Sequence, residues 1–177
     1  MTDILCLSGS LRSVSSASAL MRTLTGEMGD AATFHTADIG ALPHYDADLG
    51  IPDEVAGFID AVGNADGVLI VTPEYNYSIP GVLKNAIDWA SRPAYKSVFK
   101  GKPVFVISVS GGALGGVRAQ AHLKYILNAM LADIFACQEI VVPHAPKKIE
   151  DGRFTDRAVL DFAKTALYDF LESVNTD

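Results

Sequence analysis

The segment from Gly9 to Ser16 carries four serines and one arginine within eight residues, and these groups are suited to binding an anion. Serine hydroxyls donate hydrogen bonds, and the guanidinium of Arg12 presents a planar fork that matches the oxygens of a phosphate. No Asp or Glu occurs from Ile4 to Gly26, although the whole chain has a formal charge of −7. Because Arg12 and Arg22 both fall in this stretch, the local electrostatic field favours a dianion.

The number of glycines limits which phosphate compound this segment can bind. Only Gly9 is present, whereas the dinucleotide fingerprint requires three glycines as G-x-G-x-x-G, and the G-K-[ST] of a nucleoside triphosphate loop does not occur. The sequence therefore predicts a site for a single terminal phosphate, as on a mononucleotide. An ordinary turn is the alternative, because Gly and Ser are also common turn residues.

Aromatic and amide side chains follow one another after Pro73, in the stretch PEYNYSIPGVLKNAIDWASRP that ends at Pro93. The loop from Glu74 to Ser78 is too short to bury its two tyrosines against itself, and a flat, partly polar ligand would contact them. A plain connection between a strand and a helix is the alternative. A third loop begins at Ser110 and has four glycines from 111 to 116, where the backbone can approach a ligand closely.

The remaining reactive residues form no recognised catalytic pattern. The four histidines are scattered along the chain, at His35, His44, His122 and His144. Neither an H-E-x-x-H nor a G-x-S-x-G motif occurs, so we expect no metal site and no covalent nucleophile. Cys6 and Cys137 are expected in apolar strands as buried thiols without a redox role. The chemistry is therefore expected to come from a cofactor.

The composition is that of a compact globular chain. Of 177 residues, 49% are hydrophobic and 20% are charged, which predicts a single domain over residues 1–177 with a sizeable core. The net charge of −7 argues against nucleic acid as a partner, because a phosphate backbone requires a basic surface. No apolar run is long enough to span a bilayer and the N-terminus lacks a signal peptide, so we expect a cytoplasmic protein without a membrane partner.

Strands and helices alternate five times along the chain, and this alternation must position the three loops. The expected strands are Asp3–Ser8, Ala32–Ala37, Gly67–Thr72, Lys102–Ser110 and Glu139–Val142. The expected helices cover about 16–28, 52–64, 80–90, 117–131 and 154–174, and the first is capped by Ser15 or Ser16.

This alternation predicts the α/β class and a flavodoxin-like three-layer sandwich. Its five-stranded parallel sheet has the order 2-1-3-4-5, with helices on both faces. The loops that follow strands one, three and four then meet at one edge of the sheet. The longest other loops are 38–52 and 143–152, and the second is expected to be solvated surface.

Three segments, one at each of these loops, resemble the NADPH-dependent FMN reductases, the flavodoxin-like family that includes soluble quinone, chromate and azo-dye reductases. The segments are GSLRSVSSASAL at 9–20, PEYNYSIPGVLKNAIDWASRP at 73–93 and SGGALGGVRAQAHL at 110–123. The similarity covers most of the chain in the same order. It implies FMN as the cofactor and NADPH or NADH as the electron donor.

The resemblance assigns cofactor contacts to residues of all three loops. It implies that the FMN phosphate is bound by Ser10, Arg12, Ser15 and Ser16. It implies that the isoalloxazine ring is wrapped by Pro73, Glu74, Tyr75 and Asn76 and is approached from its other side by Ser110, Gly111 and Gly112. Ala17 of the cofactor site stands where the family often has Asn, and the lost side-chain donor is worth about 1 kcal/mol.

The implied reaction transfers a hydride from NAD(P)H to N5 of FMN, and a second substrate then takes two electrons in the same pocket by a ping-pong mechanism. Quinone-like, azo, metal-oxyanion and flavin acceptors all suit such a site. The flavin carries the chemistry, so no catalytic side chain is expected, while Tyr75 and Tyr77 form a wall of the substrate pocket. Main-chain N–H groups of the 74–76 loop and of Gly111 and Gly112 would stabilise negative charge on the ring. The family also implies a homodimer or a homotetramer.

Several alternatives remain open from the sequence. Glu74 could bond the flavin edge, bridge to a partner subunit or brace its own loop. Arg92, Lys96 and Arg118 are candidates to bind the 2′-phosphate of NADPH. A flavodoxin-type electron carrier would bind FMN without a nicotinamide, and a binding or regulatory protein of the same fold would have lost the flavin.

Overall fold

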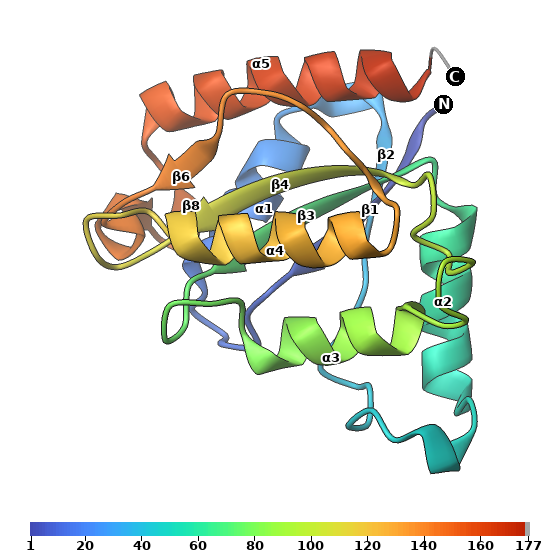
Figure 1. Cartoon of the computed structure of the whole chain (residues 1–177). Helices are drawn as coiled ribbons and strands as arrows, with labels where there is room; N and C mark the ends of the chain where they lie inside the picture. Colours follow the sequence, from blue (N-terminus) through green and yellow to red (C-terminus); the bar gives the residue numbers. More distant parts are fainter. Residues whose placement is uncertain (176–177) are drawn as a thin grey trace.

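A parallel sheet with strand order β2-β1-β3-β4-β5 runs through the computed structural model, which describes residues 1–175 (Figure 1). Its strands are β1 (Asp3–Ser8), β2 (Thr33–Thr36), β3 (Gly67–Pro73), β4 (Pro103–Val109), β5 (Asp133–Ile134) and β6 (Ile140–Val142). β1 pairs with both β2 and β3, and β4 follows on the far side of β3. The predicted flavodoxin-like order is confirmed.

Helices cover both faces of this sheet. They are α1 (Ser16–Gly26), α2 (Asp53–Asn64), α3 (Gly81–Ala90), α4 (Val117–Ala129) and α5 (Arg157–Val174). Alternate strand residues point to opposite faces: Leu69 packs in one core with α1 and α5, whereas Val68 packs in the other with α2, α3 and α4. Figure 1 shows α5 above the sheet and α3 below it. Within residues 1–175, none of the helices is long and apolar enough to cross a membrane.

The fifth strand position is divided, which the sequence did not predict. β5 pairs with the start of β4 and β6 with its end, so the expected continuous strand over 139–142 is only the second half of this edge. Cys137 lies in the break and is half-buried, so its placement as a buried strand thiol was wrong. Cys6 is buried in β1 as expected, and burial raises the pKa of its thiol to about 12.

The side chain of Gln120 on α4 bridges the break in this edge. It is fully buried, and its Nε2 donates hydrogen bonds to the carbonyls of Val106 at 3.1 Å and Ile140 at 3.3 Å. A strand continuing between β5 and β6 would have supplied a donor to the Val106 carbonyl of β4. The amide of Gln120 therefore takes the place of a missing strand hydrogen bond.

Replacing Gln120 by leucine should lower the free energy of unfolding by about 1 to 3 kcal/mol, because two buried carbonyls lose their donor. Urea unfolding measures this loss. The matched control is Gln138→Leu at an exposed position of the same break, where we expect a change within about 0.5 kcal/mol. Equal stability of Gln120→Leu and the wild type would show that the bridge contributes nothing.

The segment 143–152 is largely exposed, as the sequence predicted, but it is not a plain loop. It contains the 3-10 helix η3 (Ala145–Lys148) and β7 (Ile149–Glu150), which pairs with β8 (Arg153–Phe154) in a hairpin. Phe154 is buried and its N–H donates to Thr23 Oγ1 of α1 at 3.0 Å. The last helix accordingly starts at Arg157 and not at Phe154, and its N-cap Asp156 accepts a hydrogen bond from the N–H of Val159.

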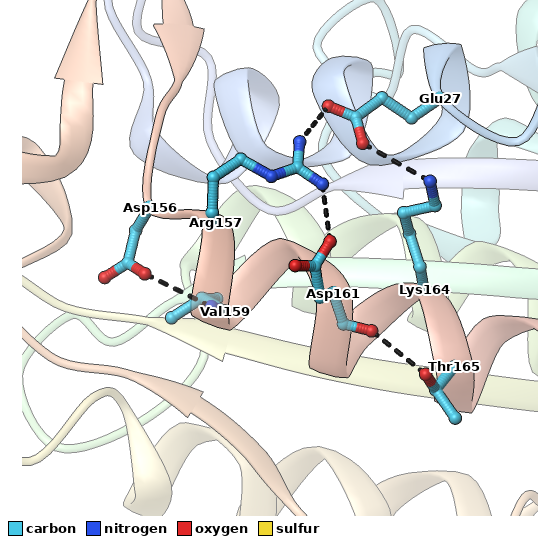
Figure 2. Close-up of polar contacts among 7 residues, drawn as sticks. All are labelled: Glu27, Asp156, Arg157, Val159, Asp161, Lys164 and Thr165. Atoms are coloured by element: carbon cyan, nitrogen blue, oxygen red, sulfur yellow. Dashed lines mark hydrogen bonds and ion pairs between the residues drawn. The ribbon is translucent and has the colours of Figure 1, made fainter.

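Ion pairs fasten α5 to the end of α1, as Figure 2 shows. Glu27 accepts hydrogen bonds from Arg157 at 2.7 Å and Lys164 at 3.5 Å, and Arg157 also bonds Asp161 at 2.5 Å. The hydrogen bond from Arg157 is the main cause that lowers the pKa of Glu27 below its usual range. The contact thus favours the ionised carboxylate in the folded state.

Replacing Glu27 by glutamine should destabilise the protein at neutral pH but not in acid. The folded-state pKa of Glu27 lies below the ordinary 4.5, so its contribution to stability is complete above that pH and is lost as the pH falls through the folded pKa. Urea unfolding from neutral pH to about pH 3 should show a difference between the proteins that closes in acid. A difference that stays constant would contradict this, and exposed Glu150→Gln is the control.

Candidate functional site

A cavity of about 140 Å³ lies at the carboxyl edge of the sheet, where the loops after β1, β3 and β4 meet. Its lining residues are Ser10, Arg12, Ser15, Ser16, Ala17, Pro73, Glu74, Tyr75, Val109, Ser110, Gly111 and Pro146. Ten of the twelve residues to which the family resemblance assigned cofactor contacts are among them. Asn76 and Gly112 are not.

One end of the cavity is built to receive an anion. Ser15 is the N-cap of α1, and its Oγ accepts the N–H of Ser18 at 3.2 Å, so the helix begins at the cavity with Ser16 and Ala17 on its wall. The first N–H groups of a helix and its dipole attract negative charge. Arg12 adds an exposed guanidinium at the rim. This end therefore suits a phosphate.

Ser10 joins the first loop to the loop after β3. Its Oγ accepts the N–H of Arg12 at 3.3 Å and is hydrogen-bonded to Tyr75 Oη at 3.3 Å. Ser10 is buried, whereas Tyr75 is 43% exposed and reaches the mouth of the cavity. Ala17 is fully buried, and the hydroxyl of Ser18 beside it is hydrogen-bonded to Ser8 at 2.7 Å. Ser18 does not line this cavity, so it does not replace the donor that Asn would add at position 17.

The residues from Tyr75 to Ser78 form a tight reverse turn. The N–H of each end residue donates to the carbonyl of the other, at 3.0 and 3.1 Å, and both central residues have positive φ, 48° at Asn76 and 67° at Tyr77. This is the backbone of a type I′ turn, which Asn adopts readily and Tyr only at a cost of about 1 kcal/mol or more. The turn therefore needs support from outside the loop.

Contacts from α4 supply that support. The guanidinium of Arg118 lies over the Tyr77 ring, 4.2 Å from its centroid, and His122 Nδ1 is hydrogen-bonded to Ser78 Oγ at 3.1 Å. These contacts place the Tyr77 ring beside α4 and outside the lining of the cavity. Tyr77 therefore does not line this cavity, and the substrate wall of Tyr75 and Tyr77 stays a prediction.

Glu74 fastens the same loop to the start of α4. Its Oε2 accepts the N–H groups of Arg118 at 3.2 Å and Ala119 at 3.4 Å, and its Oε1 accepts from Arg118 Nη1 at 3.1 Å. A carboxylate at a helix N-terminus satisfies amides that have no partner inside the helix. Of the three roles left open for Glu74, these contacts are those of a residue that braces its own loop. They also engage Arg118, one of the candidates for a 2′-phosphate.

A family model described as NADPH-dependent FMN reductase matches residues 2–147 of the chain. The chain belongs to this family. The match includes all three loops of the cavity and all five predicted strands.

Proteins and solved structures that are similar to this chain agree with this assignment. An NAD(P)H-dependent FMN reductase of Pseudomonas aeruginosa is 40% identical over 86% of this chain and 84% of its own length. A quinone reductase of Escherichia coli K12 is 38% identical over 97% and 96%. Among solved structures, the NAD(P)H:(acceptor) oxidoreductase FerB from Paracoccus denitrificans is 36% identical, with a TM-score of 0.89 over 99% of this chain and 98% of that one.

Two residues that line the cavity of this FMN reductase family member were not predicted from the sequence. Pro146 comes from η3, which had been assigned to solvated surface, and Val109 is the last residue of β4. The signal for Pro146 was available, since its segment directly follows the fifth strand and so leaves the sheet at the same edge. Within residues 1–175, no group of three or more His, Cys, Asp or Glu side chains could hold a metal ion.

Proposed function

We propose that the chain binds FMN in this cavity and uses NAD(P)H to reduce quinone-like acceptors. The observation that supports this most is the convergence of ten predicted residues, from three loops distant in sequence, on one cavity with an anion-binding end. When bound, FMN supplies the chemistry that accepts a hydride and delivers two electrons. The named activities of the relatives point to the same reaction class.

The donor set of the cavity fits a flavin mononucleotide. The phosphate end is formed by the start of α1 with Ser10, Arg12 and Ser16, and the opposite walls are Pro73 to Tyr75 and Ser110 to Gly111. The enclosed volume of about 140 Å³ is below the range that buries a drug-sized ligand. Part of FMN therefore stays at the open mouth, where a second molecule can reach it.

The chain's own residues bind and orient in this proposal. Arg12 neutralises the phosphate, and Tyr75 stands at the mouth with its hydroxyl held by Ser10. Glu74 keeps the loop fixed on α4. The N–H groups of Glu74 and Tyr75 already donate to the carbonyls of Val109 and Ser78, which leaves the N–H of Asn76 for a ligand. A homodimer or dimer of dimers belongs to the proposal, because large aromatic side chains are exposed at Tyr77, Tyr95 and Tyr125.

A visible absorption spectrum of the purified protein, taken before and after anaerobic NADPH, tests this function. We expect a yellow protein that releases FMN on denaturation, bleaches with NADPH and regains its colour with a quinone. A protein that stays colourless after incubation with excess FMN would contradict the proposal and favour a flavin-free binding protein. A yellow protein that does not oxidise NADPH or NADH would be an electron carrier.

Replacing Arg12 by glutamine should raise the dissociation constant for FMN about tenfold. This is the smallest loss expected for a charge-assisted hydrogen bond, because Arg12 is exposed to solvent. Fluorescence quenching of FMN on titration with the protein measures this constant. Arg92→Gln is the matched control, since Arg92 is exposed and lies over Tyr45, away from the cavity. Equal losses in both variants would indicate a general charge effect.

A further inference from the structure

A second and larger cavity, of about 460 Å³, adjoins the first. It lies between α1 and the chain that leaves β2, and its lining residues are Ser8, Ser10, Leu11, Arg12, Ser18, Met21, Arg22, Thr36, Ala37, Asp38 and Ile39. Ser10 and Arg12 belong to both cavities. A compound whose phosphate is bound at these two residues can therefore extend to either side.

The charges of the second cavity favour an anion. Arg22 lines this cavity and not the first, so it has no part in the FMN site proposed above. Its Nη2 donates to the carbonyl of Gly152 at 3.4 Å, which orients the guanidinium while other N–H groups remain available. Two arginines, Arg12 and Arg22, and a single carboxylate, Asp38, line this cavity in a chain of net charge −7.

The other walls provide the surfaces that a nucleoside requires. Met21 and Ile39 are 3% and 2% exposed and form an apolar wall, and Leu11 stands at the rim with 61% exposure. Asp38 follows β2 by two residues, and its Oδ1 accepts the N–H of Gly40 at 3.0 Å. The other carboxylate oxygen of Asp38 can accept hydrogen bonds from ribose hydroxyls.

We propose that this second cavity binds an adenosine phosphate moiety next to the FMN phosphate, with Arg22 on the phosphate of the moiety and Asp38 on its ribose. The volume lies within the range for sites that bury ligands of this size. Two molecules carry such a moiety: the nicotinamide dinucleotide donor, and flavin adenine dinucleotide with its flavin in the first cavity. The identity of the molecule that carries the moiety rests on the proposed function, whereas the site itself does not.

Isothermal titration of the FMN-saturated protein with 5′-AMP tests the site, because FMN then blocks the first cavity. We expect AMP to bind, Arg22→Gln to weaken that binding at least tenfold, and Ala37→Phe, which fills the cavity without changing charge, to abolish it. Arg153→Gln removes the same charge from an exposed residue that lines neither cavity and should bind AMP as the wild type does. Urea unfolding checks that each variant is folded.

Two results would overturn the inference. One is the absence of AMP binding at millimolar concentration, and the other is AMP binding that Arg22→Gln and Ala37→Phe leave unchanged. Inorganic phosphate is the second probe: we expect weaker binding than AMP, and Asp38→Ala should weaken AMP but not phosphate. If phosphate binds as tightly as AMP, the cavity is an anion site without nucleoside recognition.

Two further measurements distinguish the nicotinamide dinucleotide from the flavin dinucleotide as the source of the moiety. Two outcomes then separate this inference from the proposed function. If NADP⁺ displaces AMP from the FMN-saturated protein, the second cavity binds the nicotinamide dinucleotide donor. If AMP still binds when FMN is present but not when FAD replaces FMN, the cavity binds the adenosine part of the flavin dinucleotide. If the protein fails to bind FMN but still binds AMP in an Arg22-dependent way, only the proposed function fails. If FMN binds and AMP does not, only this inference fails.

Discussion

Replacing Glu74 by alanine should lower the free energy of unfolding by about 2 to 3 kcal/mol and raise the dissociation constant for FMN at least tenfold. The side chain of Glu74 is 13% exposed and accepts three hydrogen bonds from Arg118 and Ala119. Its removal leaves the first amides of α4 without this partner and frees Arg118. Because Pro73 and Tyr75 flank Glu74 on the cavity wall, the wall moves as well. Urea unfolding and FMN titration measure the two effects.

Two controls define what Glu74 contributes. Glu74→Gln keeps an oxygen for the α4 amides but loses the charge opposite Arg118, so both effects should be intermediate. Glu139→Ala removes an exposed carboxylate that pairs with Lys124 at 2.9 Å, and we expect a change within about 0.5 kcal/mol. Wild-type FMN affinity in a folded Glu74→Ala protein would mean that the brace does not shape the cavity.

Replacing Gly9 by alanine should destabilise the protein by about 1 to 3 kcal/mol and separate the loop after β1 from the loop after β3. A Cβ at this position would lie 2.5 Å from Thr72 Oγ1 and 3.1 Å from Pro73 Cδ. Thr72 is fully buried and its hydroxyl donates to the carbonyl of Pro73, so it cannot turn away at low cost. The strand ends must move apart, and FMN affinity should fall at least tenfold. Thermal unfolding and FMN titration measure these changes.

The contact with Thr72 can be isolated. In the double variant Gly9→Ala/Thr72→Ala the nearest clashing atom is absent, so stability and FMN affinity should return in part. Gly57→Ala is the matched control in α2, where an added Cβ meets nothing within 4 Å. There we expect a gain of up to about 1 kcal/mol from helix propensity. Equal losses in Gly9→Ala and the double variant would exclude Thr72 as the cause.

The sequence predicted the sheet order and the meeting of three loops at one edge because both depend on local patterns, whereas the individual cavity residues came from the resemblance to the family. Apolar β-branched runs mark β1, β3 and β4, and helical periodicity marks the segments between them. In a doubly wound sheet, such an alternation leaves the loops after these strands at one edge. Ser15 as the N-cap of α1 also follows from residues within one helical turn.

Errors arose where a residue's partner is distant in the chain. The break between β5 and β6 depends on Gln120, which lies on α4 and takes the place of a strand hydrogen bond. Phe154 lies outside the last helix because its side chain is buried next to α1, where Thr23 Oγ1 accepts its N–H. No local pattern signals such contacts.

The sequence by itself determined the fold class, the three loops at one edge of the sheet and a start of α1 that suits an anion. Only the tertiary structure decided which charged groups act together. It joined Glu74 to Arg118 across 44 residues, and it placed Arg12 on two cavities but Arg22 on only one. The physical reason is that backbone periodicity depends on neighbours within a few residues, whereas the partner of a charged side chain depends on how distant elements pack.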